Sequence, residues 1–216
     1  MGRRPQDIVR DGYDAMSDRY ADWQTEVSDD PRDRWTQRLL SLLPERPDIL
    51  EIGCGAGIEP TPTFARIGRL TGIDISRAQI DRARKALPAG ELIHGDATTA
   101  TFPVSSFDAV VALYTLTHIP AADLAALLAR VQTWLRPAGI VLATLGSGAS
   151  HEGVVEDWLG VRMFFSGFDE ETNERLVREA GFEVVQSQVE VIHEPESELG
   201  KGAATAAFHW ILARKL

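Results

Sequence analysis

The residues with the clearest chemical use follow a short apolar run in the stretch ILEIGCGAGIEP, residues 49–60. Three glycines stand there at alternate positions, Gly53, Gly55 and Gly57, and the acid Glu51 lies in the apolar run before them. A glycine turn after a strand lets the backbone approach a ligand closely, because no Cβ stands in the way. The pattern therefore predicts a nucleotide-type cofactor at the end of a strand.

The spacing of these glycines argues against a nicotinamide dinucleotide. The dinucleotide fingerprint, G-x-G-x-x-G/A, needs a small third residue so that helix and strand can pack closely. Counting from Gly53 places Ile58 at this position, and counting from Gly55 places Pro60 there. Neither residue is small, so an NAD-dependent oxidoreductase is a weak alternative.

The order of residues before and within the turn resembles the first motif of class I S-adenosylmethionine (SAM)-dependent methyltransferases. Two apolar residues, an acid and a further apolar residue precede G-x-G-x-G. The resemblance covers residues 48–146 well and the remainder loosely. It implies that Gly53, Gly55 and Gly57 line the methionine portion of SAM and that Glu51 lies near its amino group.

Two acids further along the chain agree with this resemblance. Asp74, 21 residues after Gly53, can accept hydrogen bonds from both ribose hydroxyls, and Asp96 in HGDA would accept from the adenine amino group. Taken alone, Asp74 is equally a helix cap and Asp96 a turn residue. Their order after the glycine turn, followed by LRPAG, favours SAM. Further cofactor contacts are implied for Ile75, Ala97, Leu113 and Tyr20.

The methyl acceptor is expected to occupy a closed, partly aromatic pocket, because the protein must align a nucleophile and exclude water. Two segments outside the common core can supply it: a predicted N-terminal helical cap, residues 1–47, and a predicted substrate lid, residues 146–168. Plain core packing is the alternative for their aromatic side chains. The expected acceptor-pocket residues are Tyr13, Tyr114, Trp158, Phe164 and Phe165.

His118, in the segment ALYTLTHIP, is the candidate catalytic residue. An imidazole with an ordinary pKa of about 6.5 suits proton removal from a hydroxyl acceptor near neutral pH. In the alternative reading, His118 forms a hydrogen bond across the loop and fixes the turn before Pro120. The other histidines show no ligand spacing with Cys, Asp or Glu, so no metal site is predicted.

Apolar periodicity from about residue 48 predicts an α/β fold. Short apolar strands alternate with amphipathic helices, as in a covered parallel sheet. The last two strand-like segments, 182–194 and 205–214, lack a helix between them and predict an antiparallel hairpin at one edge of the sheet. We therefore expect one domain over 1–216, a Rossmann-like three-layer αβα sandwich with a mostly parallel seven-stranded sheet.

Local signals place the expected helix ends. Ser76, with Gln79 three residues later, predicts a cap for one helix, and Asp169 predicts a cap for another. A helix beginning near 121 is expected to stop at Pro137 and Gly139. Pro60 and Pro62 are expected to shorten or delay the helix after the glycine turn.

Composition limits the partners. The net charge of −10 disfavours a nucleic-acid partner, and no apolar run approaches the roughly 20 residues of a membrane span. The N-terminus lacks the apolar core of a secretory signal. Cys54 is the single cysteine, which fits a reducing cytoplasm. A small molecule is the expected partner, and the oligomeric state is undecided.

The leading functional prediction is methyl transfer from SAM to an O, N or C nucleophile of a small organic molecule, with S-adenosylhomocysteine as product and no metal. The resemblance is to small methyltransferases of quinone and natural-product pathways. Two alternatives stay open: a non-catalytic SAM-binding protein, and an enzyme of this fold that performs another reaction such as cyclisation.

Overall fold

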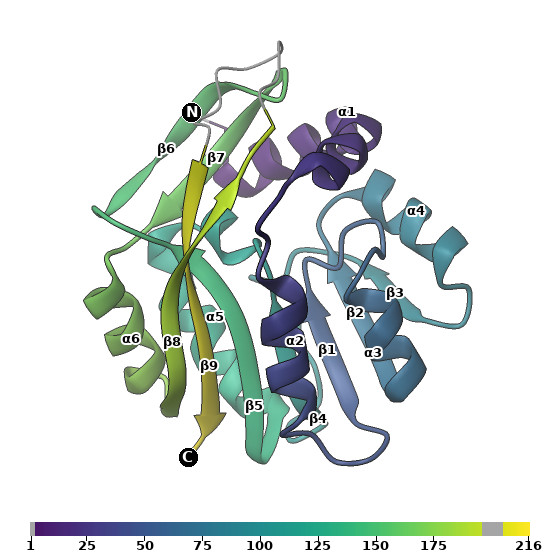
Figure 1. Ribbon diagram of the computed structural model, residues 1–216, viewed down its shortest axis with the longest axis vertical. Helices are drawn as coiled ribbons and strands as arrows, with labels where there is room; N and C mark the ends of the chain where they lie inside the picture. The colour runs from purple at the N-terminus through teal and green to yellow at the C-terminus, as the bar shows by residue number, and fades with distance from the viewer. Residues whose placement is uncertain (1–2, 196–204) are drawn as a thin grey trace.

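The computed structural model describes residues 3–195 and 205–216, and its centre is a seven-stranded sheet in the order β3-β2-β1-β4-β5-β9-β8 (Figure 1). The strands are β1 Asp48–Ile52, β2 Arg69–Asp74, β3 Glu91–His94, β4 Phe107–Ala112, β5 Leu135–Gly146, β8 Phe182–His193 and β9 Thr205–Lys215. The first five are parallel, whereas β9 runs antiparallel to both β5 and β8. The predicted sheet, including its C-terminal hairpin, is confirmed.

Helices cover both faces of this sheet. They are α1 Pro5–Glu26, α2 Arg32–Leu40, α3 Thr61–Ile67, α4 Arg77–Ala86, α5 Ala121–Trp134 and α6 Glu170–Glu179, with a short 3-10 turn, η1, at Leu116–His118. One core cluster joins Trp35 and Phe64, from α2 and α3, to one face of the sheet. The other joins Leu127 and Val177, from α5 and α6, to the opposite face. The predicted three-layer arrangement is therefore confirmed.

The helix caps agree with the sequence signals. Ser76 Oγ accepts a hydrogen bond from the Gln79 amide at 3.2 Å, and Asp169 Oδ1 accepts one from the Thr172 amide at 2.8 Å. The short helix α3 begins one residue after Pro60, with Pro62 in its first turn, as expected from the two prolines.

The end of α5 differs from the prediction. The helix ends at Trp134, before Pro137 and Gly139, and β5 already begins at Leu135. A residue that precedes proline is disfavoured in the helical region, which moves the helix end toward the N-terminus. Pro137 and Gly139 therefore lie in the irregular first part of β5, where its register with β4 shifts.

The segment 146–168 forms strands rather than an irregular loop. It contains a two-stranded sheet of β6 His151–Trp158 and β7 Val161–Gly167. Helix α1 lies beside this hairpin at one end of the main sheet (Figure 1). The described part of the predicted cap, 3–47, contains α1 and α2, and its residues 1–2 lie outside the described chain.

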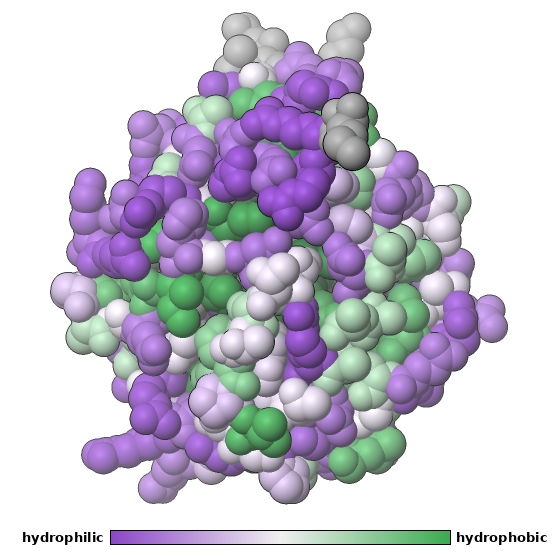
Figure 2. Space-filling model, turned by 180° about the vertical axis from the view of Figure 1, so that it is seen from behind, coloured by the Kyte–Doolittle hydropathy of each residue, from purple (hydrophilic) through white to green (hydrophobic). Residues whose placement is uncertain are grey.

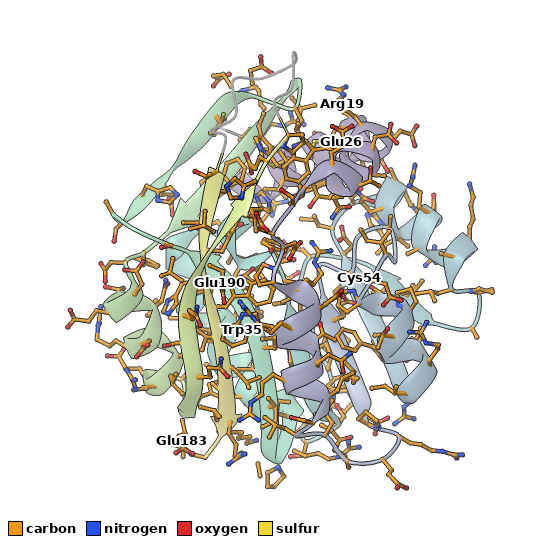
Figure 3. The ribbon with its side chains drawn as sticks, viewed as in Figure 1. Arg19, Glu26, Trp35, Cys54, Glu183 and Glu190 are labelled. Carbon is orange, nitrogen blue, oxygen red and sulfur yellow. The ribbon has the colours of Figure 1, made fainter. Side chains whose placement is uncertain are left out.

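Helix α2 is fixed to the sheet through a buried indole. The Trp35 ring stacks on Trp210 at 5.6 Å between centroids, and Trp35 Nε1 donates to Glu190 Oε1 at 3.0 Å. Figure 3 shows Trp35 and Glu190 pointing toward each other between α2 and β8. This contact holds α2 across the middle of the sheet.

On the rear face, shown in Figure 2, hydrophilic residues cover much of the surface and apolar areas lie between them. Among the helices that the structure describes, none combines the length and the apolar character that a membrane crossing requires.

We expect Ser76→Ala to destabilise the protein by about 1–2 kcal/mol, since it removes a helix cap and a buried hydroxyl bond. Ser76 Oγ also donates to Asp14 Oδ1 at 2.6 Å and so ties α4 to α1. Urea unfolding measures the change. Ser41→Ala, which loses an exposed bond to the Arg38 carbonyl, is the matched control and should change stability by less than about 0.5 kcal/mol. Equal losses in the two variants would contradict the prediction.

Candidate functional site

A cavity of about 110 Å³ lies where β1, β2, β3 and β4 end. The glycine turn, the residues after these strands and one side of α1 line it. Such a position, outside the carboxyl ends of parallel strands, is where open α/β sheets bind ligands. The lining contains nine of the predicted cofactor residues: Tyr20, Glu51, Gly53, Gly55, Asp74, Ile75, Asp96, Ala97 and Leu113.

Gly53 and Gly55 have backbones that favour glycine, with φ of 74° and 53°. A Cβ added to Gly53 would stand 1.9 Å from Thr115 Oγ1, so this glycine allows the turn to approach the segment after β4. A Cβ added to Gly55 would meet nothing within 4 Å. Since Gly55 lines the cavity, a side chain there would occupy ligand space.

Gly57 is not among the residues that line this cavity, and its predicted contact with the cofactor stays a prediction. A Cβ added there would lie 3.2 Å from both Cα and Cβ of Ala83 in α4. The residue therefore permits close packing between the turn and a helix. Alternate glycines in a turn need not face one ligand, because the chain direction changes at each of them.

Asp74 is held by the backbone on both sides. The Gly55 amide donates to its Oδ2 at 2.9 Å and the Ser76 amide to its Oδ1 at 2.8 Å. Burial raises the pKa of this carboxyl, and the two amide bonds oppose the rise. Each carboxylate oxygen has a second lone-pair site, so both can still accept from a diol.

Glu51 is buried, with 4% of its surface exposed. Thr61 Oγ1 donates to its Oε1 at 3.1 Å, whereas Oε2 has no hydrogen-bond partner within the described residues. Burial raises the pKa of this carboxyl to about 8. A buried acceptor without a partner is costly, so an ammonium group in the cavity would satisfy it. This orphaned oxygen fits the amino group of SAM.

Asp96 is oriented by its own turn. Its Oδ1 accepts from the Thr98 amide at 2.8 Å and from Thr98 Oγ1 at 2.7 Å. Asp96, Ala97 and Ile75 line the same cavity as Asp74. Two carboxylates of the cavity lining, Asp74 and Asp96, are thus each held in place by backbone amides.

A second cavity, of about 230 Å³, adjoins the first. Both are lined by Tyr13, Tyr20, Arg32, Tyr114 and His118. Aromatic side chains from several parts of the fold line the second cavity: Tyr13, Tyr20 and Trp23 from α1, Trp158 and Phe165 from the hairpin, Tyr114 from the segment after β4, and Phe208 from β9. The arrangement can hold an apolar or ring-bearing molecule beside the first ligand.

Four of the predicted acceptor residues, Tyr13, Tyr114, Trp158 and Phe165, line this cavity, and Phe164 does not. Phe164 is only 3% exposed and packs beneath α1 with Met163. Successive residues of a strand face opposite sides, so Phe164 and Phe165 cannot both face the cavity. The sequence alone does not show which of the two alternating sets of β7 side chains faces the cavity.

Asp30 and Arg32 were not predicted as site residues. Arg32 Nη2 lies 3.0 Å from Asp30 Oδ2, and its guanidinium carbon lies 5.0 Å from the centre of the Tyr114 ring. Tyr114 Oη donates to Asp30 Oδ1 at 2.8 Å. In the sequence these charges resemble an ordinary helix start, and only the docking of α2 brings them to Tyr114.

His118 is buried, and both of its ring nitrogens are engaged. Nδ1 lies 2.8 Å from the Phe164 carbonyl oxygen, and Nε2 lies 2.9 Å from Tyr13 Oη. Burial lowers the pKa of this histidine to about 4, so it is neutral at neutral pH. The bond across to Phe164 agrees with the alternative reading of a loop-fixing histidine.

Candidate metal ligands do not gather in this region. Residues 3–195 and 205–216 contain no group of three or more His, Cys, Asp or Glu side chains placed to hold an ion.

Comparison with known proteins places this geometry in a family. Residues 49–139 match the model of a methyltransferase domain. The chain is 33% identical over 202 residues to 27-O-demethylrifamycin SV methyltransferase of Amycolatopsis mediterranei, covering 80% of this chain and 72% of that protein. The chain belongs to the SAM-dependent methyltransferases. This match extends well beyond the glycine turn and its strands.

Other matches to this methyltransferase are shorter or more distant. Nocamycin O-methyltransferase of Saccharothrix syringae is 35% identical over 113 residues, but the alignment spans 48% of this chain and 40% of that protein. A Burkholderia thailandensis 1,6-didemethyltoxoflavin-N1-methyltransferase structure has a TM-score of 0.72 at 18% identity, covering 100% of this chain and 92% of that one. The [4+2]-cyclase SpnF has a TM-score of 0.73 at 18% identity, covering 100% and 97%. These two structures share the fold.

The two turn glycines of this methyltransferase should respond differently to alanine. Gly53→Ala should lower the free energy of unfolding by about 2 kcal/mol or more, because of its clash and its positive φ. Gly55→Ala should cost only about 1 kcal/mol, yet weaken S-adenosylhomocysteine binding at least about tenfold by filling the cavity. Urea unfolding and calorimetric titration separate the effects. Unchanged affinity in a folded Gly55→Ala protein would contradict the placement.

Glu51 should make the ligand-free methyltransferase less stable as pH rises. Its pKa is raised from 4.5 to about 8, so the folded state holds the proton more tightly than the unfolded state. This contribution is complete below pH 4.5 and is lost as the pH rises through about 8. Urea unfolding of wild type and Glu51→Gln at about pH 5 and about pH 9 measures it. An identical pH dependence in both proteins would contradict the assignment.

Proposed function

We propose that this methyltransferase transfers a methyl group from SAM in the first cavity to an oxygen, nitrogen or carbon nucleophile of a small organic molecule in the second. The observation that carries the proposal is the adjacency of the two cavities, which share the side chains of Tyr13, Tyr20, Tyr114 and His118. When bound, SAM supplies an activated sulfonium methyl group. S-adenosylhomocysteine is the expected product.

The residues of the first cavity bind and orient the cofactor. The unpartnered Oε2 of Glu51 receives the amino group, and Asp74 accepts from the ribose hydroxyls. Asp96 accepts from the adenine amino group, with Ile75 against the base. Gly53 and Gly55 let the chain approach the methionine portion. In these roles a carboxylate of the protein accepts hydrogen bonds from the amino group, from the ribose hydroxyls and from the adenine amino group of the cofactor.

The residues of the second cavity align the acceptor and exclude water. Methyl transfer from an activated donor depends mainly on such alignment. We assign the described part of the cap, 3–47, and the hairpin segment, 146–168, to this covering role, because each contributes aromatic side chains to the cavity. His118 acts here through its hydrogen bonds, since Tyr13 occupies the ring nitrogen that a direct base would need.

The setting proposed for the reaction is the cytoplasm, with a small-molecule partner. The free thiol of Cys54 is buried, and burial raises its pKa, as suits an unreactive cysteine in a reducing compartment. The net charge of −10 disfavours nucleic acid as the acceptor.

A non-catalytic SAM-binding role and a cyclisation are the competing functions. The cyclase neighbour shares the fold at 18% identity and carries no evidence about the reaction of this chain. Methylated product and S-adenosylhomocysteine appear together only in methyl transfer. Turnover of SAM with phenolic, amine and carbon-acid acceptors, followed by mass spectrometry, decides among the three. Cofactor binding without any methylated product would favour the alternatives.

We expect Asp74→Asn to weaken S-adenosylhomocysteine binding about 10- to 100-fold, because charged hydrogen bonds to the ribose are worth about 1.5–3 kcal/mol. Calorimetric titration measures the change. Asp81→Asn, on the exposed side of α4, is the matched control and should leave the affinity unchanged. Equal affinity in wild type and Asp74→Asn would show that the cofactor lies elsewhere.

A further inference from the structure

Tyr13 and His118 form a hydrogen-bonded pair at the boundary between the two cavities. Tyr13 Oη lies 2.9 Å from His118 Nε2, and both side chains line both cavities. Tyr13 belongs to α1 and His118 to η1, and the two residues are 105 positions apart in the chain. A molecule that reaches from the second cavity toward the first therefore passes this pair.

The direction of the hydrogen bonds follows from the Phe164 carbonyl. This oxygen can only accept, so His118 Nδ1 carries the hydrogen of their 2.8 Å bond. In a neutral imidazole the other nitrogen, Nε2, then has a lone pair and must accept. Tyr13 is consequently the donor to His118, and its single hydroxyl hydrogen is committed.

We propose that the Tyr13 oxygen, with its hydrogen held by His118, selects acceptors whose nucleophile still carries a hydrogen, a hydroxyl above all, and disfavours the methylated product. Tyr13 Oη presents only lone pairs to the cavity, so it pairs with an O–H donor and not with an ether oxygen. A buried oxygen that faces another acceptor is left without a partner, which costs affinity. The inference rests on the proposed function and names the substrate class of that site.

The pair has little freedom to rearrange. The Tyr13 ring packs edge-on against Tyr20 at 5.1 Å, His118 at 5.4 Å and Trp158 at 6.1 Å between centroids. Gly12, beside it, seats α1 so closely that an added Cβ would stand 2.7 Å from Met163 Cε. A hydroxyl held by packing on several sides keeps its orientation when a ligand enters.

Three hydroxyl groups of the second cavity are already paired within the protein. Tyr114 Oη donates to Asp30, Ser147 Oγ donates to Glu170, and Ser166 Oγ donates to the Ile119 carbonyl. These three hydroxyls have their hydrogens committed elsewhere, so they offer no donor to an ether oxygen. The neutral state of His118, which follows from its lowered pKa, keeps Tyr13 in the same role at neutral pH.

The experiment uses a matched pair of probes, 2-naphthol and its methyl ether, 2-methoxynaphthalene. The two differ in whether the oxygen carries a hydrogen. Their affinities for the full chain are measured by calorimetry at neutral pH, with S-adenosylhomocysteine present and absent. We expect the wild type to bind 2-naphthol at least about tenfold more tightly than the ether, as for a buried hydrogen bond against an unpaired acceptor.

Two variants test the origin of this ratio. Tyr13→Phe removes the lone pairs and should bring the naphthol-to-ether ratio close to one. His118→Phe releases the hydrogen of Tyr13, which can then donate to the ether, so the ether should bind more tightly than it does to wild type. A purely structural role would weaken both probes alike and leave their ratio unchanged.

Trp35→Phe is the control for general destabilisation. It loses a buried side-chain hydrogen bond to Glu190, yet Trp35 lines neither cavity, so the ratio should match wild type. A wild type that binds both probes equally or binds neither, or a Tyr13→Phe protein that keeps the ratio, would overturn the proposal. Failure of methyl transfer would leave this ratio intact, so the two hypotheses fail separately.

Discussion

The bonding of one carboxylate to two backbone amides organises the end of the sheet. Asp74 receives the Gly55 amide from the turn after β1 and the Ser76 amide at the start of α4. Ser76 in turn donates to Asp14 of α1. A connected series of hydrogen bonds thus fixes the relative positions of the glycine turn, of α4 and of α1, the helix that lines both cavities. Removing water from this carboxylate is unfavourable, and the fixed amides offset that cost.

Much of the fold was predictable because its signals are local. The alternation of apolar strands and amphipathic helices, the Ser76 and Asp169 caps and the helix shortened by Pro62 all depend on residues a few positions apart. The carboxyl ends of parallel strands meet at one edge of the sheet. The presence of Glu51, Asp74 and Asp96 in one cavity lining therefore follows from the strand order. Their proposed contacts with a cofactor are predictions that binding experiments must decide.

The features that the sequence did not reveal depend on contacts between distant segments. Whether Phe164 or Phe165 faces the cavity depends on how the hairpin packs on α1. Gly57 contacts α4, although it continues the same glycine pattern as its neighbours. Arg32 reaches Tyr114 only through the docking of α2, and the Tyr13–His118 bond joins residues whose separation in the chain leaves no periodic signal.

The strand order also constrains how the sheet assembles. Strand β8 precedes β9 in the chain but reaches the rest of the sheet through it, since β9 lies between β5 and β8. The pairing of Ile140 with Arg214 closes a long loop. Closing such a loop costs conformational entropy, so this pairing is expected to form slowly. Until β9 inserts, the outer side of β5 exposes unpaired backbone groups and can pair wrongly with another chain. The last strand of the chain is thus the one that protects the backbone of β5 from pairing with another molecule.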